Sequence, residues 1–181
     1  MKTMRTLIIV VLALFGFSTV AVAQGTIVGV AESLQADQIK IGGARISLYG
    51  IDAPDPDMDR FCTADGDLFG CYANARRGLL ILIDEGPFEC TPTGKFNFMA
   101  FPYMICTVNG VDVAESLIRS GLAYAFLPQT DVYLEAQKAA EAEGVGIWQP
   151  GISVMLPWVH REEFNRPVFG PQTHICRSDL G

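Results

Sequence analysis

Short runs of apolar residues, separated by glycine and polar residues, predict β-strands in two parts of the chain. Gly42-Gly43 lies between two of these runs and predicts a tight hairpin turn. The expected strands are residues 26–30, 37–41, 44–50, 88–91 and 103–108.

The apolar spacing becomes helical between residues 72 and 83. Ala75, Leu79 and Ile83 recur at every fourth position, and the pattern stops before Gly86-Pro87. This period is typical of a helix that buries one face. A helix is therefore expected between the third and fourth strands.

Two further helices are expected, at residues 113–121 and 132–143. Asp112 is the expected N-cap of the first, and Gly121 and Gly144 are the expected ends. Three strands, one helix, two strands and two closing helices favour an α+β fold. This order suits a five-stranded barrel capped by three helices.

The first 23 residues have the pattern of a signal peptide. Lys2 and Arg5 give a basic start, residues 7–17 are uncharged and apolar, and Ala21-Val22-Ala23 is a small-residue cleavage site. The apolar run is about half of the roughly 20 residues that span a membrane. We therefore expect export to the periplasm or the medium, with no membrane span after cleavage.

The remaining chain is expected to form one domain, at residues 24–161, followed by an irregular tail at residues 162–181. No periodicity is visible after Pro157. Without Lys2 and Arg5, 11 basic residues face 20 acidic ones, a net charge of −9. Nucleic-acid-binding proteins gain affinity from clustered Lys and Arg, so this charge disfavours a nucleic-acid partner.

Five cysteines follow the signal peptide, and export favours disulfides. Cys62 and Cys71 flank a loop rich in Gly and Asp, and Cys90 and Cys106 lie at the edges of two runs that could pair as strands. Bridges within these two pairs are expected. Cys176 is left unpaired, as a free thiol or an intermolecular bridge, and His174 beside it is too little to indicate a metal site.

Residues 46–55, Ile-Ser-Leu-Tyr-Gly-Ile-Asp-Ala-Pro-Asp, resemble the signature of the thermonuclease (staphylococcal-nuclease-like) family, usually Arg-Leu-Tyr-Gly-Ile-Asp-Ala-Pro-Glu. Residues 108–115, 120–124 and 146–148 resemble further segments of that family, and the likeness covers about residues 25–161. It implies an oligonucleotide/oligosaccharide-binding (OB) barrel. Exported relatives with cysteines at similar places support the two disulfides.

The resemblance also implies a calcium site. Asp37 and Asp52 match the two aspartates that hold the ion in the family, and the backbone carbonyl of Ala53 matches the third ligand. Calcium accepts several oxygens in loose geometry, so these groups and water would give a weak site. Asp55 stands at the position of the catalytic glutamate and is one methylene shorter.

The two arginines that neutralise phosphate in the family have no equivalent here. Ser47 stands at the first position, and counting back from Cys106 places Phe101 at the second. In an alternative register Lys95 is the remnant of the second arginine, but a lysine cannot form the bidentate fork of a guanidinium. Nuclease activity is therefore expected to be weak or absent.

Two other features have simpler interpretations. His160 and His174 have no evident partner in the sequence and are expected at the surface. Residues 96–104 contain three phenylalanines and a tyrosine, and could be a sugar- or partner-binding face, a buried strand or an oligomer contact.

Three classes of function are compatible with these features. The first is an accessory or binding protein without catalysis, because size and layout also resemble exported thermonuclease-like proteins assigned to succinoglycan, a rhizobial exopolysaccharide. That resemblance implies a polysaccharide partner, which needs no basic groove. The second is a weak calcium-dependent phosphodiesterase acting on nucleic acid, and the third is a protein-interaction module.

Overall fold

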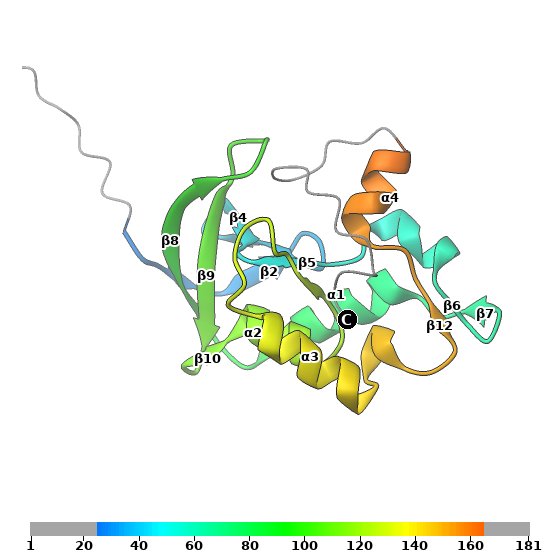
Figure 1. Ribbon diagram of the computed structural model, residues 1–181. Helices are drawn as coiled ribbons and strands as arrows, with labels where there is room; N and C mark the ends of the chain where they lie inside the picture. The colour runs from blue at the N-terminus through cyan, green and yellow to red at the C-terminus, as the bar shows by residue number, and fades with distance from the viewer. Residues whose placement is uncertain (1–24, 165–181) are drawn as a thin grey trace, which may run out of the picture.

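The computed structural model describes residues 25–164, which form a mixed α+β fold with one large and two small sheets (Figure 1). The large sheet has seven strands in the order β1-β8-β9-β4-β3-β2, with β10 added on β9. Among the described strands, only β4 and β9 are parallel neighbours. The strands are β1 (Ile27–Gly29), β2 (Ala31–Ser33), β3 (Gln38–Ile41), β4 (Ala44–Leu48), β8 (Phe88–Phe96), β9 (Pro102–Val108) and β10 (Val111–Asp112).

The hairpin of β3 and β4 confirms the predicted turn. Ile41 pairs with Ala44, so Gly42 and Gly43 form the whole connection, and both have positive φ angles of 55° and 92°. Glycine adopts such angles without steric cost. The hairpin sets the register that places Ser47 opposite Gln38.

The two ends of the strand order come from almost the same stretch of chain. β1 pairs with β8 and β2 pairs with β3, and only Val30 lies between β1 and β2. Among the described residues no ladder joins the two ends of this path. The α+β class is confirmed, whereas the closed five-stranded barrel stays a prediction.

The three predicted helices are present as α1 (Cys71–Asp84), α2 (Val113–Arg119) and α3 (Leu134–Glu143), and Figure 1 shows them together below β2 and β4. The side chain of Asp112 accepts a hydrogen bond from the Glu115 amide, as expected of an N-cap. Gly144 ends α3 in the left-handed conformation. Their buried faces join Ile39, Ile46 and Phe88 of the sheet in one apolar core.

A fourth helix, α4 (Pro157–Glu163), corrects the expectation of an irregular tail after Pro157. Pro157 is at its start, where a proline is compatible with helical geometry. Apart from Pro157, its buried residues are the polar His160 and Arg161. A seven-residue helix that buries polar side chains has no apolar period to detect.

The remaining elements lie around η1 (Pro56–Phe61), a short 3-10 helix. One small sheet joins β5 (Ile51–Asp52) to β11 (Tyr124–Ala125), and another joins β6 (Thr63–Ala64), β7 (Asp67–Leu68) and β12 (Ile152–Ser153). A second 3-10 helix, η2 (Gly146–Trp148), follows α3. Within residues 25–164 we find no helix long and apolar enough to cross a membrane.

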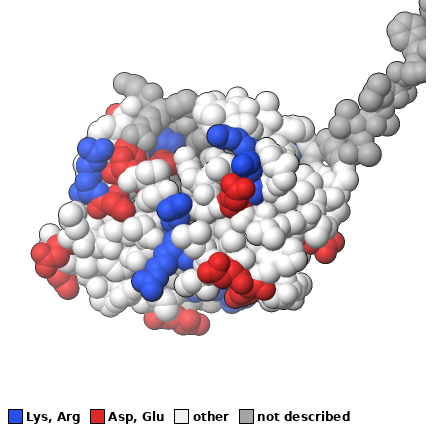
Figure 2. Space-filling view, turned by 180° about the vertical axis from the view of Figure 1, so that it is seen from behind, with Lys and Arg blue, Asp and Glu red and all other residues white. Residues whose placement is uncertain are grey.

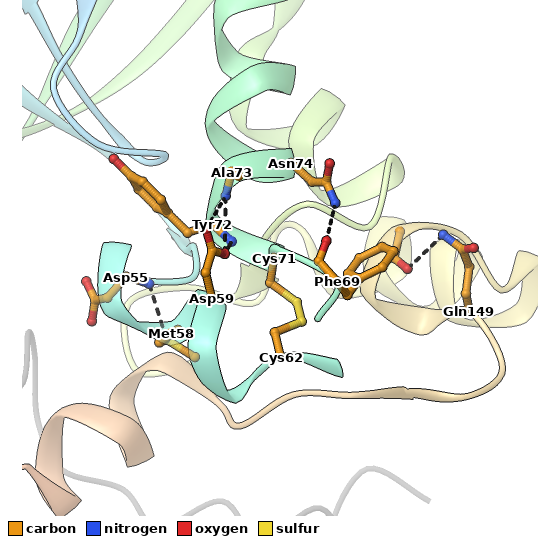
Figure 3. Close-up of a disulfide and its surroundings, with 11 residues drawn as sticks. Asp55, Met58, Asp59, Cys62, Phe69, Cys71, Tyr72, Ala73, Asn74 and Gln149 are labelled. Atoms are coloured by element: carbon orange, nitrogen blue, oxygen red, sulfur yellow. Dashed lines mark hydrogen bonds between the residues drawn. A yellow bond between two sulfur atoms is a disulfide. The ribbon is translucent and has the colours of Figure 1, made fainter. Parts of the chain in front are cut away.

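Both predicted disulfides are present. Cys62–Cys71 joins the end of η1 to the start of α1 (Figure 3), and Cys90–Cys106 joins directly opposed residues of β8 and β9. In the same region Asp59 accepts hydrogen bonds from the amides of Tyr72 and Ala73, at 2.6 and 3.3 Å, and so caps α1. The predicted signal peptide, His174 and Cys176 lie outside the described residues.

Candidate functional site

Three aspartates meet at one pocket. Asp37 precedes β3, Asp52 ends β5, and Asp55 immediately precedes η1. All three line the same cavity, together with the amide side chains of Gln35, Gln38 and Gln129. The structure thus places the two predicted metal aspartates and the predicted catalytic position side by side. Ala53 is buried there, and its amide donates to Oδ2 of Asp37 at 3.3 Å.

Arg161 enters this pocket from α4. Its Nη2 contacts Oδ2 of Asp52, and its Nη1 lies 2.9 Å from Oδ2 of Asp55. The residue is only 3% exposed. Within residues 25–164 it is the single positively charged residue that lines the cavity.

α4 is held on the pocket by further contacts. His160, fully buried, lies with Nε2 3.2 Å from Oδ2 of Asp57, and its ring packs against Phe61 at a centroid distance of 5.5 Å. The expectation that His160 is a surface residue was therefore wrong. Trp158 packs against Tyr124 and Phe126, at centroid distances of 5.9 and 5.6 Å.

Burial and mutual repulsion govern the charges of the pocket. Burial raises the pKa of Asp52 to about 7, and Asp37 and Asp55 raise it too, against the opposing effect of Arg161. Burial likewise raises the pKa of Asp37 to about 6, again with Arg161 opposing. Three carboxylates share one guanidinium, so the cluster carries excess negative charge, and Asp37 and Asp52 hold protons more readily than isolated aspartates do.

The guanidinium itself stays charged. Burial alone would lower the pKa of Arg161, but Asp52, Asp55 and Asp37 together raise it above its ordinary value. Both ends of its fork are engaged by carboxylates. A guanidinium engaged in this way has little attraction left for a phosphate, because the carboxylates around it outweigh its positive charge.

The pocket does not fit a divalent metal ion while Arg161 is docked. The predicted calcium ligands are Asp37, Asp52 and the carbonyl of Ala53, and a cation on Asp52 would have to share that carboxylate with Arg161. No group of three His, Cys, Asp or Glu side chains suited to a metal ion is found in residues 25–164.

A neutral contact occupies the position where the family resemblance would place the first arginine. Ser47 is buried, and its hydroxyl accepts a hydrogen bond of 3.1 Å from the side-chain amide of Asn97. Asn97 lies in the loop between β8 and β9, where its Oδ1 accepts from the amides of Met99 and Phe101, both at 2.9 Å. The loop therefore inserts an amide where a guanidinium was expected in an active enzyme.

Neither candidate for the second arginine lines the pocket. Phe101 packs under the guanidinium of Arg45, 5.4 Å from the ring centroid. Nζ of Lys95 donates to the hydroxyl of Tyr49 at 2.7 Å and to the carbonyl of Gln129 at 3.3 Å. The ammonium group of Lys95 is thus engaged by Tyr49 and Gln129, and Lys95 itself lies within β8, which ends at Phe96.

The size of the cavity limits what it can hold. Its volume is about 20 Å³, which is room for one water molecule. A phosphodiester or a sugar ring would not fit without displacement of the surrounding side chains. The geometry therefore suits an acidic cluster with an internal cation rather than an anion site.

The surface adds no basic groove on the face that Figure 2 shows, where basic and acidic side chains are interspersed among uncharged areas. On the extension of β8 and the loop that follows it, Phe96, Phe98 and Met99 are 55%, 54% and 43% exposed. We call these three residues the hairpin tip. It is the exposed part of the aromatic segment noted in the sequence.

Three features of the site were not predicted from the sequence: Arg161, the pairing of His160 with Asp57, and Asn97. Arg161 follows Asp52 by 109 residues and Asp55 by 106. No spacing rule links positions so far apart. No periodicity is visible after Pro157, so no local pattern pointed to Arg161 either.

No family model matches the chain. The chain is 30% identical over 127 residues to the succinoglycan biosynthesis protein ExoI of Rhizobium meliloti (strain 1021), covering 68% of this chain. The matched part spans 65% of the length of that protein.

Proposed function

We propose that this protein is an exported accessory or binding protein, without catalysis of its own, in the biosynthesis of an exopolysaccharide of the succinoglycan type. The similarity to a succinoglycan biosynthesis protein supports the pathway. The observation that carries the absence of catalysis is the pairing of Arg161 with Asp52 and Asp55, which places the protein's own cation inside the acidic pocket.

We propose a degenerate thermonuclease-type barrel as the scaffold. In support, the signature segment forms β4 and β5 and delivers Asp52 to the pocket. Strands and helices follow the order of that family. The continuity of β1 and β2 through Val30, with pairing at opposite ends of the strand order, is the arrangement that a closed barrel requires.

Phosphodiester cleavage needs positive groups that face the reacting phosphate, because negative charge develops on its oxygens. Ser47 is paired with Asn97, and Arg161 is engaged by two carboxylates. Removal of one such electrostatic group typically costs about 10²–10³ in rate. Two absent groups argue for an inactive or nearly inactive site.

Two disulfides within residues 25–164 support export, as does the predicted signal peptide. Cys62–Cys71 and Cys90–Cys106 are both buried disulfides. Such bridges persist in oxidising compartments such as the periplasm and the medium.

The hairpin tip is the surface that we assign to the polysaccharide. Exposed aromatic rings offer flat apolar faces of the kind on which sugar rings and bases stack. The small acidic pocket has no room for a sugar residue, whereas Phe96 and Phe98 are exposed on a strand end and its loop. An acidic protein can use such a surface without a basic groove.

Retention on immobilised succinoglycan tests this function. The full chain should be retained, and replacement of Phe96 and Phe98 by serine should abolish retention. Replacement of Val28 and Val30 by serine is the matched control, because these residues are exposed and apolar but lie on the edge of the sheet. Equal retention of all three proteins, or none by the wild type, would refute the assignment.

Co-purification of one stable protein partner, lost in the Phe96/Phe98 variant, would favour an interaction module instead.

A weak calcium-dependent phosphodiesterase is the second candidate, favoured by the convergence of Asp37, Asp52 and Asp55. Cleavage of single-stranded DNA with and without calcium separates the two functions. We expect no turnover above background. Calcium-stimulated turnover that disappears in Asp52→Asn would establish the enzyme and overturn our proposal.

A further inference from the structure

The acidic pocket already contains a cation that belongs to the protein. Arg161 contacts Asp52 and lies 2.9 Å from Asp55, and it comes from a helix more than 100 residues further along the chain. Its guanidinium therefore lies among the carboxylates that a bound metal ion would need.

We propose that Arg161 occupies the cation position of this pocket in place of a divalent metal ion, and that its replacement by a neutral side chain converts the pocket into a calcium site. The wild-type protein then has no need of a metal at this position. In the native chain the guanidinium of Arg161 prevents calcium from binding there, and the substitution removes this obstacle.

The oxygen atoms around Arg161 have the chemistry that calcium selects. Asp37 and Asp52 supply carboxylates. The backbone amide of Ala53 donates to the carboxylate of Asp37 at 3.3 Å and holds it beside the chain that follows Asp52. Calcium accepts six to eight oxygens in irregular geometry, with water completing the shell. A single guanidinium balances one of three negative charges, whereas a divalent ion would balance two.

The space needed for the ion is the space that the guanidinium fills. With Arg161 docked the cavity measures about 20 Å³, room for one water molecule. Removal of the planar head would add enough volume for an ion and its water ligands. A methionine at position 161 keeps the apolar stem of the side chain but removes its donors and charge.

Removal of the guanidinium leaves other contacts that hold α4 in place. His160 pairs with Asp57, and Trp158 packs against Tyr124 and Phe126. These contacts involve neither Asp37 nor Asp52. The walls of the pocket should therefore persist when only the Arg161 head is lost, which makes a single substitution a clean test.

The test is a calcium titration of the full chain by calorimetry, together with thermal melting with and without calcium. Arg161→Met should bind one calcium ion at least tenfold more tightly than the wild type, with a dissociation constant of about 10⁻⁴–10⁻³ M. Arg119→Met is the matched control, because Arg119 is an exposed arginine paired with Glu115 on α2. It removes the same charge and should bind no better than the wild type.

A second pair of variants ties the gain to the pocket. Addition of Asp37→Asn to Arg161→Met should abolish the calcium binding. Arg161→Met with Asp55→Asn removes one positive and one negative charge and retains Asp37 and Asp52. This double variant should keep the gain in calcium affinity while leaving less unbalanced charge in the pocket. If Arg161→Met folds only when calcium is added, that dependence supports the proposal equally.

Three results would overturn it. One is a folded Arg161→Met/Asp55→Asn variant that binds calcium no better than the wild type. Another is a gain that survives Asp37→Asn. The third is wild-type binding as tight as that of Arg161→Met and equally dependent on Asp37. Calcium binding by these variants is independent of retention on succinoglycan, so failure of one proposal leaves the other standing.

Discussion

The core of the main sheet and the contact between α4 and the acidic pocket are held by opposite kinds of interaction. Ile39, Ile46 and Phe88 are buried against other apolar side chains. Arg161 and His160 are buried just as deeply, but against carboxylates. Apolar packing tolerates many neighbours, whereas a buried charge requires one partner in one place. The pocket is therefore the region that depends more on the identity of single residues.

Phe88→Ala should produce the largest loss of stability. Phe88 is fully buried in the sheet core, and truncation of such a residue costs about 3–5 kcal/mol. The measurement is urea unfolding followed by circular dichroism. Because no charge is involved, the loss should be the same at pH 5 and pH 8. A strong pH dependence would show that the core and the pocket are coupled.

Arg161→Met should lower the free energy of unfolding by about 3 kcal/mol at pH 8, because it leaves buried carboxylates without their cation. The loss should be smaller at pH 5, where Asp37 and Asp52 hold protons more readily because burial raises the pKa of each. The same unfolding measurement at both pH values checks this. An equal loss at the two pH values would mean that Arg161 contributes packing rather than charge.

The pH dependence of the wild type should reveal the raised carboxyl pKa values directly. The native protein binds protons that the unfolded chain releases, so the free energy of unfolding should fall as the pH rises from about 5 to 7. Asp37, with a pKa raised to about 6, should contribute on the order of 1 kcal/mol to this fall. In Asp37→Asn the slope over this window should be flatter, and an unchanged slope would contradict the assignment.

Substitution at the hairpin tip should have the smallest effect on stability. Phe96→Ser with Phe98→Ser alters exposed side chains, so the free energy of unfolding should change by less than about 0.5 kcal/mol per site. Polysaccharide retention should nevertheless be lost. A large loss of stability would instead show that these rings support the loop that carries Asn97.

Much of the fold was predictable because its signals are local. Short apolar runs predicted five strands of the main sheet but not β2 or β10. A four-residue period predicted α1, and Asp112 marked the start of α2. Both disulfides followed from cysteines placed beside a loop and at strand edges. α4 was not predicted because it lacks a local signal: it is seven residues long, and two of its buried residues, His160 and Arg161, are polar.

The candidate site was predictable only in part. Asp37 and Asp52 could be placed together through a family pattern, and the structure brings them to one pocket. The amide of Asn97 beside Ser47 could not be anticipated, because it depends on the path of the loop between β8 and β9. Neither Lys95 nor Phe101, the two candidates for the second arginine position, lines the cavity. Neither alignment of this segment therefore adds a positive charge to the pocket.

The sequence by itself determined α1, α2, α3, five strands of the main sheet and the two disulfide pairs, because these depend on neighbouring residues and on residue type. The tertiary structure alone decided that Arg161 fills the acidic pocket. An ion pair across 109 residues leaves no local trace. It forms because folding excludes water from Asp52, and a buried carboxylate must then find a positive partner or a proton.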